Sequence, residues 1–251
     1  MIRRNMSGHS KWASIKHKKA ATDAKRGKAF TRVANMLTIA AKEGGGDPTM
    51  NFKLRLAVDK AKAVNMPLSN IERAVKRGTG EGGGSQVEEL KYEGYGHGGV
   101  AILVNTVTDN KNRTSADVRS TLTKNGGRMA DAGAVSWVFE QQGQIVAKDT
   151  SEKAQLAAID AGASDVEVED GKLFIYCDVS SIKKIKEVLE GLNIPIESAE
   201  ITSKPKNYVK IENEETASKI LKLVDALESL DDVTEVYANF DIPDEILGKI
   251  D

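Results

Sequence analysis

The chain has 251 residues, of which 40% are hydrophobic and 29% charged, and its formal net charge at pH 7 is −1. This composition is typical of a folded protein with two or three small domains. It excludes a membrane-spanning helix, because no apolar run approaches the roughly 18 residues that a span needs. Met1–Asn5 lacks the apolar stretch of a signal peptide, and the single Cys177 excludes an internal disulfide. We therefore expect a cytoplasmic protein that does not bind membranes.

The near-zero net charge hides a division of charge along the chain. Residues 1–80 contain 18 Lys+Arg and 5 Asp+Glu, a net charge of +13, whereas residues 81–251 contain 18 and 32, a net charge of −14. A basic segment of this density indicates a polyanionic partner, most often nucleic acid. The acidic portion 151–251 promotes solubility, and it is also a candidate surface for a basic partner protein or for shielding the basic segment.

The basic segment is predicted to contain an arm and three short helices. Residues 1–22 form the arm. A helix over 23–43 places its apolar side chains on one face and its cations on the opposite face. Two helices follow, one over 50–64 and one that begins with Ser69–Glu72 as a capping box and ends at Gly78 as its C-terminal cap.

A glycine-rich linker, Gly78–Ser85, coincides with the change in charge sign and marks a domain boundary. Beyond it, strands are expected at 88–93, 99–107, 135–140, 143–148, 165–169, 172–177, 196–202, 206–211 and 233–239, and helices at 111–125, 151–161, 180–191 and 213–229. Turn residues predict hairpins at Gln141–Gly143 and Glu169–Gly171. Without its first edge strand, the stretch 134–203 has the βαββαβ order of a ferredoxin-like fold.

The sequence therefore predicts a multi-domain α+β protein. An N-terminal three-helix bundle precedes two α/β domains, one of which is ferredoxin-like and inserted in the other. The predicted boundaries are 1–22 for the basic arm, 23–78 for the bundle, 79–133 with 204–251 for the discontinuous α/β domain, and 134–203 for the inserted domain.

Candidate nucleic-acid-binding residues lie mainly in the arm and the first helix. Cations there bind phosphates and release counterions, and interleaved aromatic rings can stack on exposed bases. A smaller basic cluster lies at the start of the helix over 111–125. Nucleic-acid contact and ordinary helix-surface charge explain this cluster equally well. The candidates are Lys11, Trp12, Lys16, His17, Lys18, Lys19, Lys25, Arg26, Lys28, Arg32, Lys111 and Arg113.

Catalytic, metal and cofactor sites are not expected. His9 and His17 have no third ligand at a recognisable spacing, and the glycine-rich stretches lack the ending of a phosphate-binding loop. Cys177 alternates with apolar residues and is predicted to be a core thiol. His97 is predicted to lie in a turn between two strands. No acid–base pair or nucleophile arrangement stands out, so we expect a protein that is not an enzyme.

Several long motifs resemble the YebC/PmpR family. The stretch Ser7–Lys19 (SGHSKWASIKHKK) resembles the family opening AGHSKW…IKHKK. The resemblance extends over the chain from Met6, and it departs from the family at His97, where proline is common. Further matching motifs are Asp23–Lys28, Asn65–Pro67, Asn70–Ala74, Tyr92–Tyr95, Thr108–Thr114 and Asn125–Gly127.

The resemblance implies a three-domain fold that agrees with the one predicted above, and it implies a cytoplasmic, DNA-binding transcriptional regulator. Some members, including mitochondrial relatives, resemble translation factors that bind ribosomal RNA and relieve stalls at proline-rich stretches. A protein-interaction scaffold, whose basic end binds an acidic protein, is a third hypothesis from the residues. DNA and ribosomal RNA both require a phosphate-binding surface, so the residues leave the choice open, and they predict no particular oligomeric state.

Overall fold

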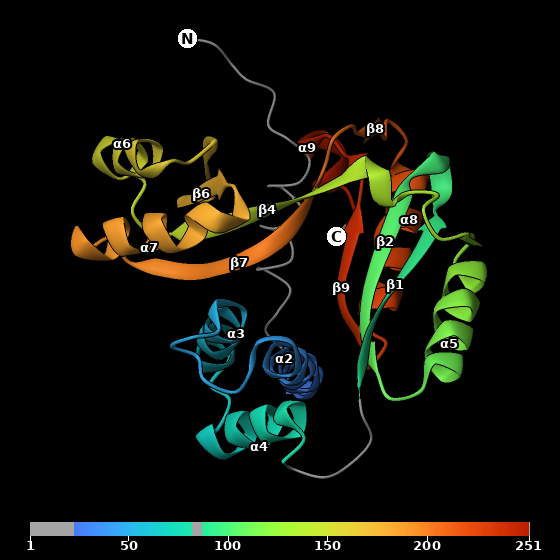
Figure 1. The fold of residues 1–251 in the computed structure, drawn as a ribbon. Helices are drawn as coiled ribbons and strands as arrows, with labels where there is room; N and C mark the ends of the chain where they lie inside the picture. Colours follow the sequence, from blue (N-terminus) through green and yellow to red (C-terminus); the bar gives the residue numbers. More distant parts are fainter. Residues whose placement is uncertain (1–22, 82–86, 251) are drawn as a thin grey trace. The chain divides into compact units, whose positions relative to one another are not determined.

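The protein is described by a computed structural model of residues 23–81 and 87–250. These residues fall into two compact units (Figure 1). Phe139–Lys204 forms the inserted unit, and the other described residues form the main unit.

The main unit begins with three helices, α2 (Asp23–Gly44), α3 (Phe52–Ala63) and α4 (Leu68–Thr79). Apolar side chains at helical spacing meet in one core, in which Leu37 and Leu54 are wholly buried and Ile71 nearly so. Asn51 caps α3, because its side chain accepts a hydrogen bond from the backbone N–H of Leu54. The three-helix bundle therefore forms as the hydrophobic pattern predicts.

A four-stranded antiparallel sheet forms the centre of the main unit. Its strands are β1 (Glu88–Tyr95), β2 (Ala101–Thr108), β3 (Arg128–Ala130) and β9 (Val233–Ala238), in the order β3-β1-β2-β9. Strands β2 and β9 pair with Ile102 opposite Ala238, so the sheet joins segments from both sides of the inserted unit. The short edge strand β3 was not among the predicted strands.

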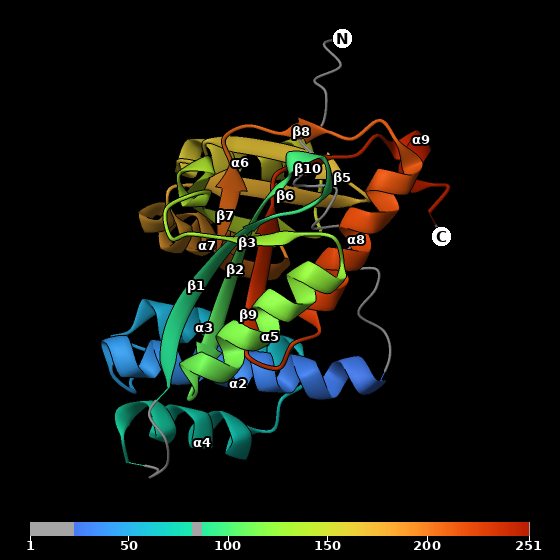
Figure 2. The same ribbon diagram turned by 90° about the vertical axis from the view of Figure 1, so that its right-hand side faces the viewer.

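Helices cover both faces of this sheet. Helices α5 (Lys111–Lys124) and α8 (Glu214–Glu228) pack against one face and against each other (Figure 2). Helix α2 lies against β2 and β9 on the other face, where Ile39 packs with Val87 and Val107. The remaining elements of the main unit are η1 (His97–Gly99), η2 (Ser136–Val138), β8 (Val209–Lys210), β10 (Phe240–Asp241) and α9 (Asp244–Leu247).

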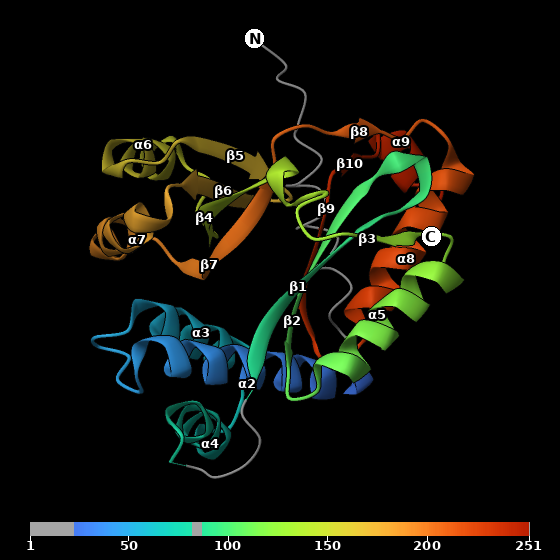
Figure 3. The same ribbon diagram turned by 45° about the vertical axis from the view of Figure 1, so that its right-hand side comes forward.

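The inserted unit has the chain order βαββαβ. Its elements are β4 (Phe139–Ala147), α6 (Glu152–Ala161), β5 (Asp165–Glu169), β6 (Lys172–Cys177), η3 (Val179–Ser181), α7 (Ile182–Gly191) and β7 (Ile196–Pro205). The strand order is β5-β6-β4-β7, and α6 packs beside α7 (Figure 3). This is the ferredoxin-like arrangement. The predicted hairpin at Glu169–Gly171 is confirmed, because Asp170 and Gly171 have φ of 47° and 73° in a two-residue turn.

The hairpin predicted at Gln141–Gly143 is wrong. Strand β4 runs without interruption from Phe139 to Ala147, and Gly143 lies opposite Cys177 in the ladder. A Cβ on Gly143 would lie 2.3 Å from Cγ1 of Ile182, on the first residue of α7. The glycine is therefore needed because a helix side chain packs directly onto the strand backbone, and it does not mark a turn.

The predicted capping box and the cap at Gly78 are also wrong. Helix α4 begins at Leu68, its N-cap Pro67 makes no side-chain capping hydrogen bond, and Gly80 is the left-handed C-cap. Gly78 lies inside the helix, where a Cβ would come within 2.3 Å of the Thr38 carbonyl oxygen of α2. Close helix packing therefore explains this glycine, as it explains Gly143.

A buried carboxylate fixes the loop that follows β3. Glu93 of β1 is only 6% exposed, and its two oxygens accept backbone N–H bonds from Gly133 (2.7 Å), Val135 (2.5 Å) and Ser136 (2.9 Å). Burial alone would raise the pKa of Glu93, but these hydrogen bonds outweigh it, and the pKa lies below its ordinary value. The charged form therefore stabilises the folded main unit.

Replacing Glu93 with Gln should lower the free energy of unfolding by about 2–3 kcal/mol at pH 7, because an amide cannot serve all three donors. A carboxyl with a depressed folded pKa contributes stability above its unfolded pKa of about 4.3, and this contribution is lost as the pH falls further. As the pH falls below about 4.3, the free energy of unfolding should therefore decrease less for E93Q than for wild type. Urea unfolding across pH measures both effects. E88Q, at the exposed start of the same strand, is the control, and an equal loss in the two variants would contradict the role of Glu93.

Replacing Gly143 with Ala should lower the free energy of unfolding by about 1–3 kcal/mol, because the new methyl group overpacks the contact with Ile182 and Cys177. Gly191→Ala is the matched control, since nothing lies within 4 Å of a Cβ there, and its effect should stay within about 1 kcal/mol. Denaturant unfolding of the full chain measures both. A neutral G143A variant would show that the α7–β4 contact is looser than described.

Candidate nucleic-acid interface

The predicted site residues divide into three groups. Lys11, Trp12, Lys16, His17, Lys18 and Lys19 lie outside the described residues. Lys25 and Arg26 lie in the first turns of α2, and their side chains are outside the description. The side chains of Lys28, Arg32, Lys111 and Arg113 are described, and the structure places the first two apart from the last two.

Lys28 and Arg32 contact the C-terminal end of α8. The Lys28 ammonium donates to the Ser229 carbonyl at 2.8 Å, and the Arg32 guanidinium donates to the Glu228 carbonyl at 2.7 Å. Helix α8 has no basic residue in its own last turn. A cation near the terminal carbonyls of a helix is favourable, because it complements the helix dipole and satisfies unpaired acceptors. These two cations therefore have an intramolecular role in joining α2 to α8.

Other bundle cations also connect the helices to the sheet. Lys42 donates to the Val87 carbonyl at 2.7 Å, Lys53 lies 3.6 Å from Glu89, and Lys60 lies 3.5 Å from Glu235. These ion pairs are partly exposed, so each contributes little to stability. They nevertheless show that much of the described positive charge of the bundle faces acceptors of the same unit.

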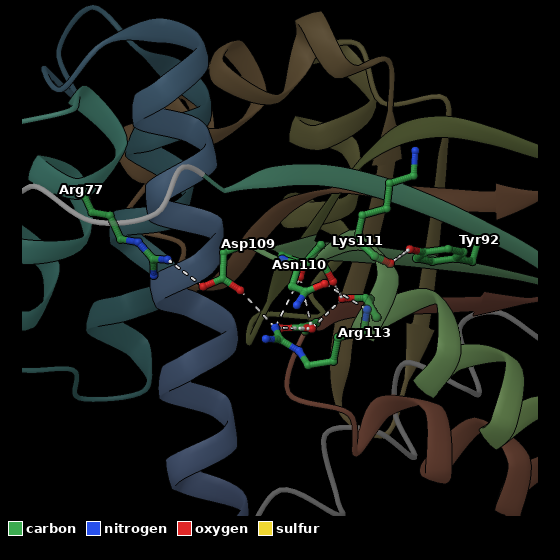
Figure 4. Close-up of polar contacts among 9 residues, drawn as sticks. Arg77, Tyr92, Asp109, Asn110, Lys111 and Arg113 are labelled. Carbon is green, nitrogen blue, oxygen red and sulfur yellow. Dashed lines mark hydrogen bonds and ion pairs between the residues drawn. The ribbon is translucent and has the colours of Figure 1, made fainter.

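A polar cluster surrounds the N-terminus of α5 (Figure 4). Asn110 caps the helix, since its side chain accepts from the backbone N–H of Arg113 at 3.1 Å. The Arg113 guanidinium lies 2.9 Å from Asp232 and 3.2 Å from Asp109. The hydrogen bond and the charge of Asp232, followed by the hydrogen bond to Asp109, raise the pKa of Arg113. Asp232 also accepts from the buried Thr114 hydroxyl at 2.6 Å.

The cluster around Arg113 is close to neutral. Arg77 of α4 lies 4.0 Å from the second oxygen of Asp109, so two arginines face two aspartates. Arg113 therefore joins the β2–α5 connection to the α8–β9 connection, and it would have to leave Asp232 to bind a phosphate. Lys111 differs, because it is exposed and its side chain points away from Asp109 (Figure 4).

Two predictions about individual residues are confirmed. Cys177 is a core thiol, and burial, followed by the nearby charge of Asp178, raises its pKa to about 11. His97 lies in a turn between β1 and β2, where its Nε2 is 3.0 Å from the Asn125 carbonyl oxygen.

The part of the chain that the structure describes contains neither a candidate metal site nor a candidate membrane-spanning helix. No group of three or more His, Cys, Asp or Glu side chains there is placed to hold a metal ion. None of the helices described is both long enough and apolar enough to cross a membrane.

Sequence reasoning missed one exposed aromatic residue. Trp137 lies in η2 with 64% of its surface exposed, between the buried Val135 and Val138. The segment was predicted to be a strand over 135–140, in which alternation would have placed residues 135 and 137 on the same face. Because η2 interrupts the strand pattern, Trp137 instead turns outward from its buried neighbours.

Comparison with known proteins identifies relatives over nearly the whole chain. Residues 10–81 match the TACO1/YebC protein N-terminal domain, and residues 87–240 match the TACO1/YebC second and third domain. A "probable transcriptional regulatory protein" of Halothermothrix orenii is 53% identical over 250 residues, covering 98% of this chain and 99% of that protein. One of Geobacter sulfurreducens is 53% identical over 247 residues, covering 98% of this chain and all of that protein.

A solved structure has the same fold. The crystal structure of a conserved hypothetical protein from Aquifex aeolicus matches with a TM-score of 0.86 and 49% identity, over 94% of this chain and 98% of that one. The predicted fold class, with N-terminal helices followed by α/β domains, is therefore confirmed.

Replacing Asp232 with Ala should lower the free energy of unfolding by about 1–2 kcal/mol, because the carboxylate accepts hydrogen bonds from both Arg113 and the buried Thr114. The neighbouring Asp231→Ala is the matched control, since Asp231 is exposed and its truncation should be nearly neutral. Thermal and denaturant unfolding compare the two. Equal effects of D231A and D232A would contradict the clamp described for the α5 N-terminus.

Proposed function

Because the chain belongs to the TACO1/YebC family, we propose that it is a non-enzymatic nucleic-acid-binding regulator that acts on transcription by binding DNA in the cytoplasm. The observation that carries this proposal is the division of charge, with a net +13 over residues 1–80 and −14 over the rest. A polyanion is attracted to one end of such a chain and repelled by the other. The names of the relatives from Halothermothrix orenii and Geobacter sulfurreducens, each a probable transcriptional regulatory protein, support the same proposal.

The contacts of the described cations narrow the proposed interface. Lys28, Arg32 and Arg113 each have acceptors within the main unit, so they would bind phosphate only after exchanging those partners. We therefore assign the principal phosphate contacts to the lysines of residues 11–19, with Lys25, Arg26 and Lys111 in support. These are backbone contacts, which position a protein on nucleic acid without reading its sequence. The proposal accordingly includes weak sequence specificity.

The test is the salt dependence of binding to duplex DNA. Changing Lys11, Lys16, Lys18 and Lys19 together to Gln should reduce the slope of log affinity against log salt by up to about 4 units, if all four lysines contact phosphates. Fluorescence anisotropy of a labelled duplex, measured between low and moderate salt, gives the slope.

The matched control removes four exposed lysines from the acidic portion of the chain. Lys183, Lys184, Lys219 and Lys222 are all exposed, and their change to Gln alters the net charge equally. The control variant should keep the wild-type slope. Equal slopes in wild type and in the variant of residues 11–19 would overturn the assigned interface, because counterion release would then come from elsewhere.

The same cations would bind ribosomal RNA, so a second experiment distinguishes DNA from ribosomal RNA. Specific promoter enrichment by a tagged chain, in fractions free of ribosomes, supports the DNA proposal. Sedimentation with ribosomes that is lost when residues 7–22 are deleted would replace it with a translation factor. Binding that resists both salt and nuclease would replace it with a protein-interaction scaffold.

A further inference from the structure

Trp137 is the most exposed aromatic side chain among the large hydrophobic residues that the structure describes, at 64%. Val135 and Val138 on either side of it are buried, and its indole Nε1 donates to the Ala134 carbonyl at 3.0 Å. The ring is therefore held by its own loop in a fixed orientation at the surface. An isolated exposed apolar residue is normal on a protein, so exposure alone does not assign a role.

Several hydrogen bonds hold the backbone beneath Trp137. Glu93 accepts three backbone N–H bonds from residues 133, 135 and 136, and the Tyr95 hydroxyl donates to the Ala134 carbonyl at 3.1 Å. On the other side, the Val138 carbonyl accepts from the Lys206 N–H at 2.8 Å. A buried carboxylate costs desolvation, which these hydrogen bonds offset. Because the loop is already ordered, a ligand that binds the indole ring causes little further loss of conformational entropy.

Two exposed cations lie next to the loop. Lys206 is exposed, and its backbone is bonded to the residue that follows Trp137. Arg128 of β3 is also exposed, and its guanidinium lies 4.6 Å from the centroid of the Tyr95 ring, whose hydroxyl contacts the same loop. Asp131 is the one acidic residue in the segment 128–138. A fixed aromatic ring with cations nearby is the combination that binds unpaired nucleotides, because the ring stacks on a base while the cations attract the backbone.

We propose that Trp137 is a stacking site for an unpaired base, so that the nucleic acid bound by this protein includes a single-stranded segment. This inference rests on the proposed function and adds the form of nucleic acid that is recognised. A duplex presents its bases edge-on in the grooves and leaves no exposed face for an indole, whereas a single strand does. Arg128 and Lys206 position the strand through its phosphates.

The test compares Trp137→Ala with Trp137→Phe. Anisotropy of a labelled 20-nucleotide single strand, and of the same sequence as a duplex, gives the two affinities for the full-length chain. W137A should weaken single-strand binding by about ten-fold, within the range found for truncated stacking aromatics, and leave duplex binding unchanged. W137F retains a stacking ring and should restore most of the affinity. Leu156→Ala is the control, since Leu156 is another exposed apolar residue and should have no effect.

The outcomes separate the stacking site from the proposed function. If wild type and W137A bind a single strand with equal affinity and the binding still depends on salt, the stacking site alone is overturned. Trp137 would then be a candidate contact for a protein partner. An equal loss of single-strand and duplex binding in W137A would also overturn it. Wild type that binds neither form would overturn both proposals. The midpoint of thermal unfolding of W137A should match that of wild type, because the ring is exposed. If W137A is less stable than wild type, the comparison of W137F with wild type still tests the stacking site.

Discussion

The structure depends on the pairing of β2 with β9, which brings residues 102 and 238 opposite each other across 136 positions of sequence. Without this pairing the central sheet has no strand from the C-terminal part, and both α8 and α2 lose their packing against β9. The same constraint explains how another unit can be inserted in this one. The chain leaves at Val138 and returns at Lys206, and a 2.8 Å backbone hydrogen bond joins these two residues. Because the exit and the return are adjacent, the inserted unit does not disturb the sheet that it interrupts.

The positive charge of the N-terminal portion has two separate roles. Several described cations of the bundle contact the sheet or the end of α8, and they join the helices to the α/β part of the main unit. The larger excess lies in residues 1–26, which contain 8 Lys+Arg and a single Asp. This distribution explains why a basic helix need not be a nucleic-acid-binding helix. Helix periodicity places Lys28 and Arg32 opposite the bundle core, but a second layer of the same unit already occupies that side.

Local pattern predicted the helices and the order of the ferredoxin-like unit, because amphipathic periodicity and turn residues carry that information. The errors have a common physical cause. Gly78 and Gly143 are glycines because a backbone from elsewhere in the fold, or a helix side chain, approaches within 2.3 Å of a would-be Cβ. Such a contact leaves no trace in the neighbouring residues. Glu93 is missed for the same reason, since its three donors lie 40 to 43 positions away. Arg113 has one partner of each kind. Asp109 is near it in the sequence, whereas Asp232 is distant and cannot be found from the local pattern.

Nucleic acid is expected to contact the basic N-terminal portion and the Trp137 loop, and to avoid the acidic portion. Ultraviolet cross-linking of the full chain to a partly single-stranded oligonucleotide, followed by peptide mapping, tests it most directly. Cross-linked peptides are expected within residues 7–32 and at Trp137, with none from residues 151–191. Cross-links concentrated in the inserted unit, with residues 7–32 unmodified, would contradict it.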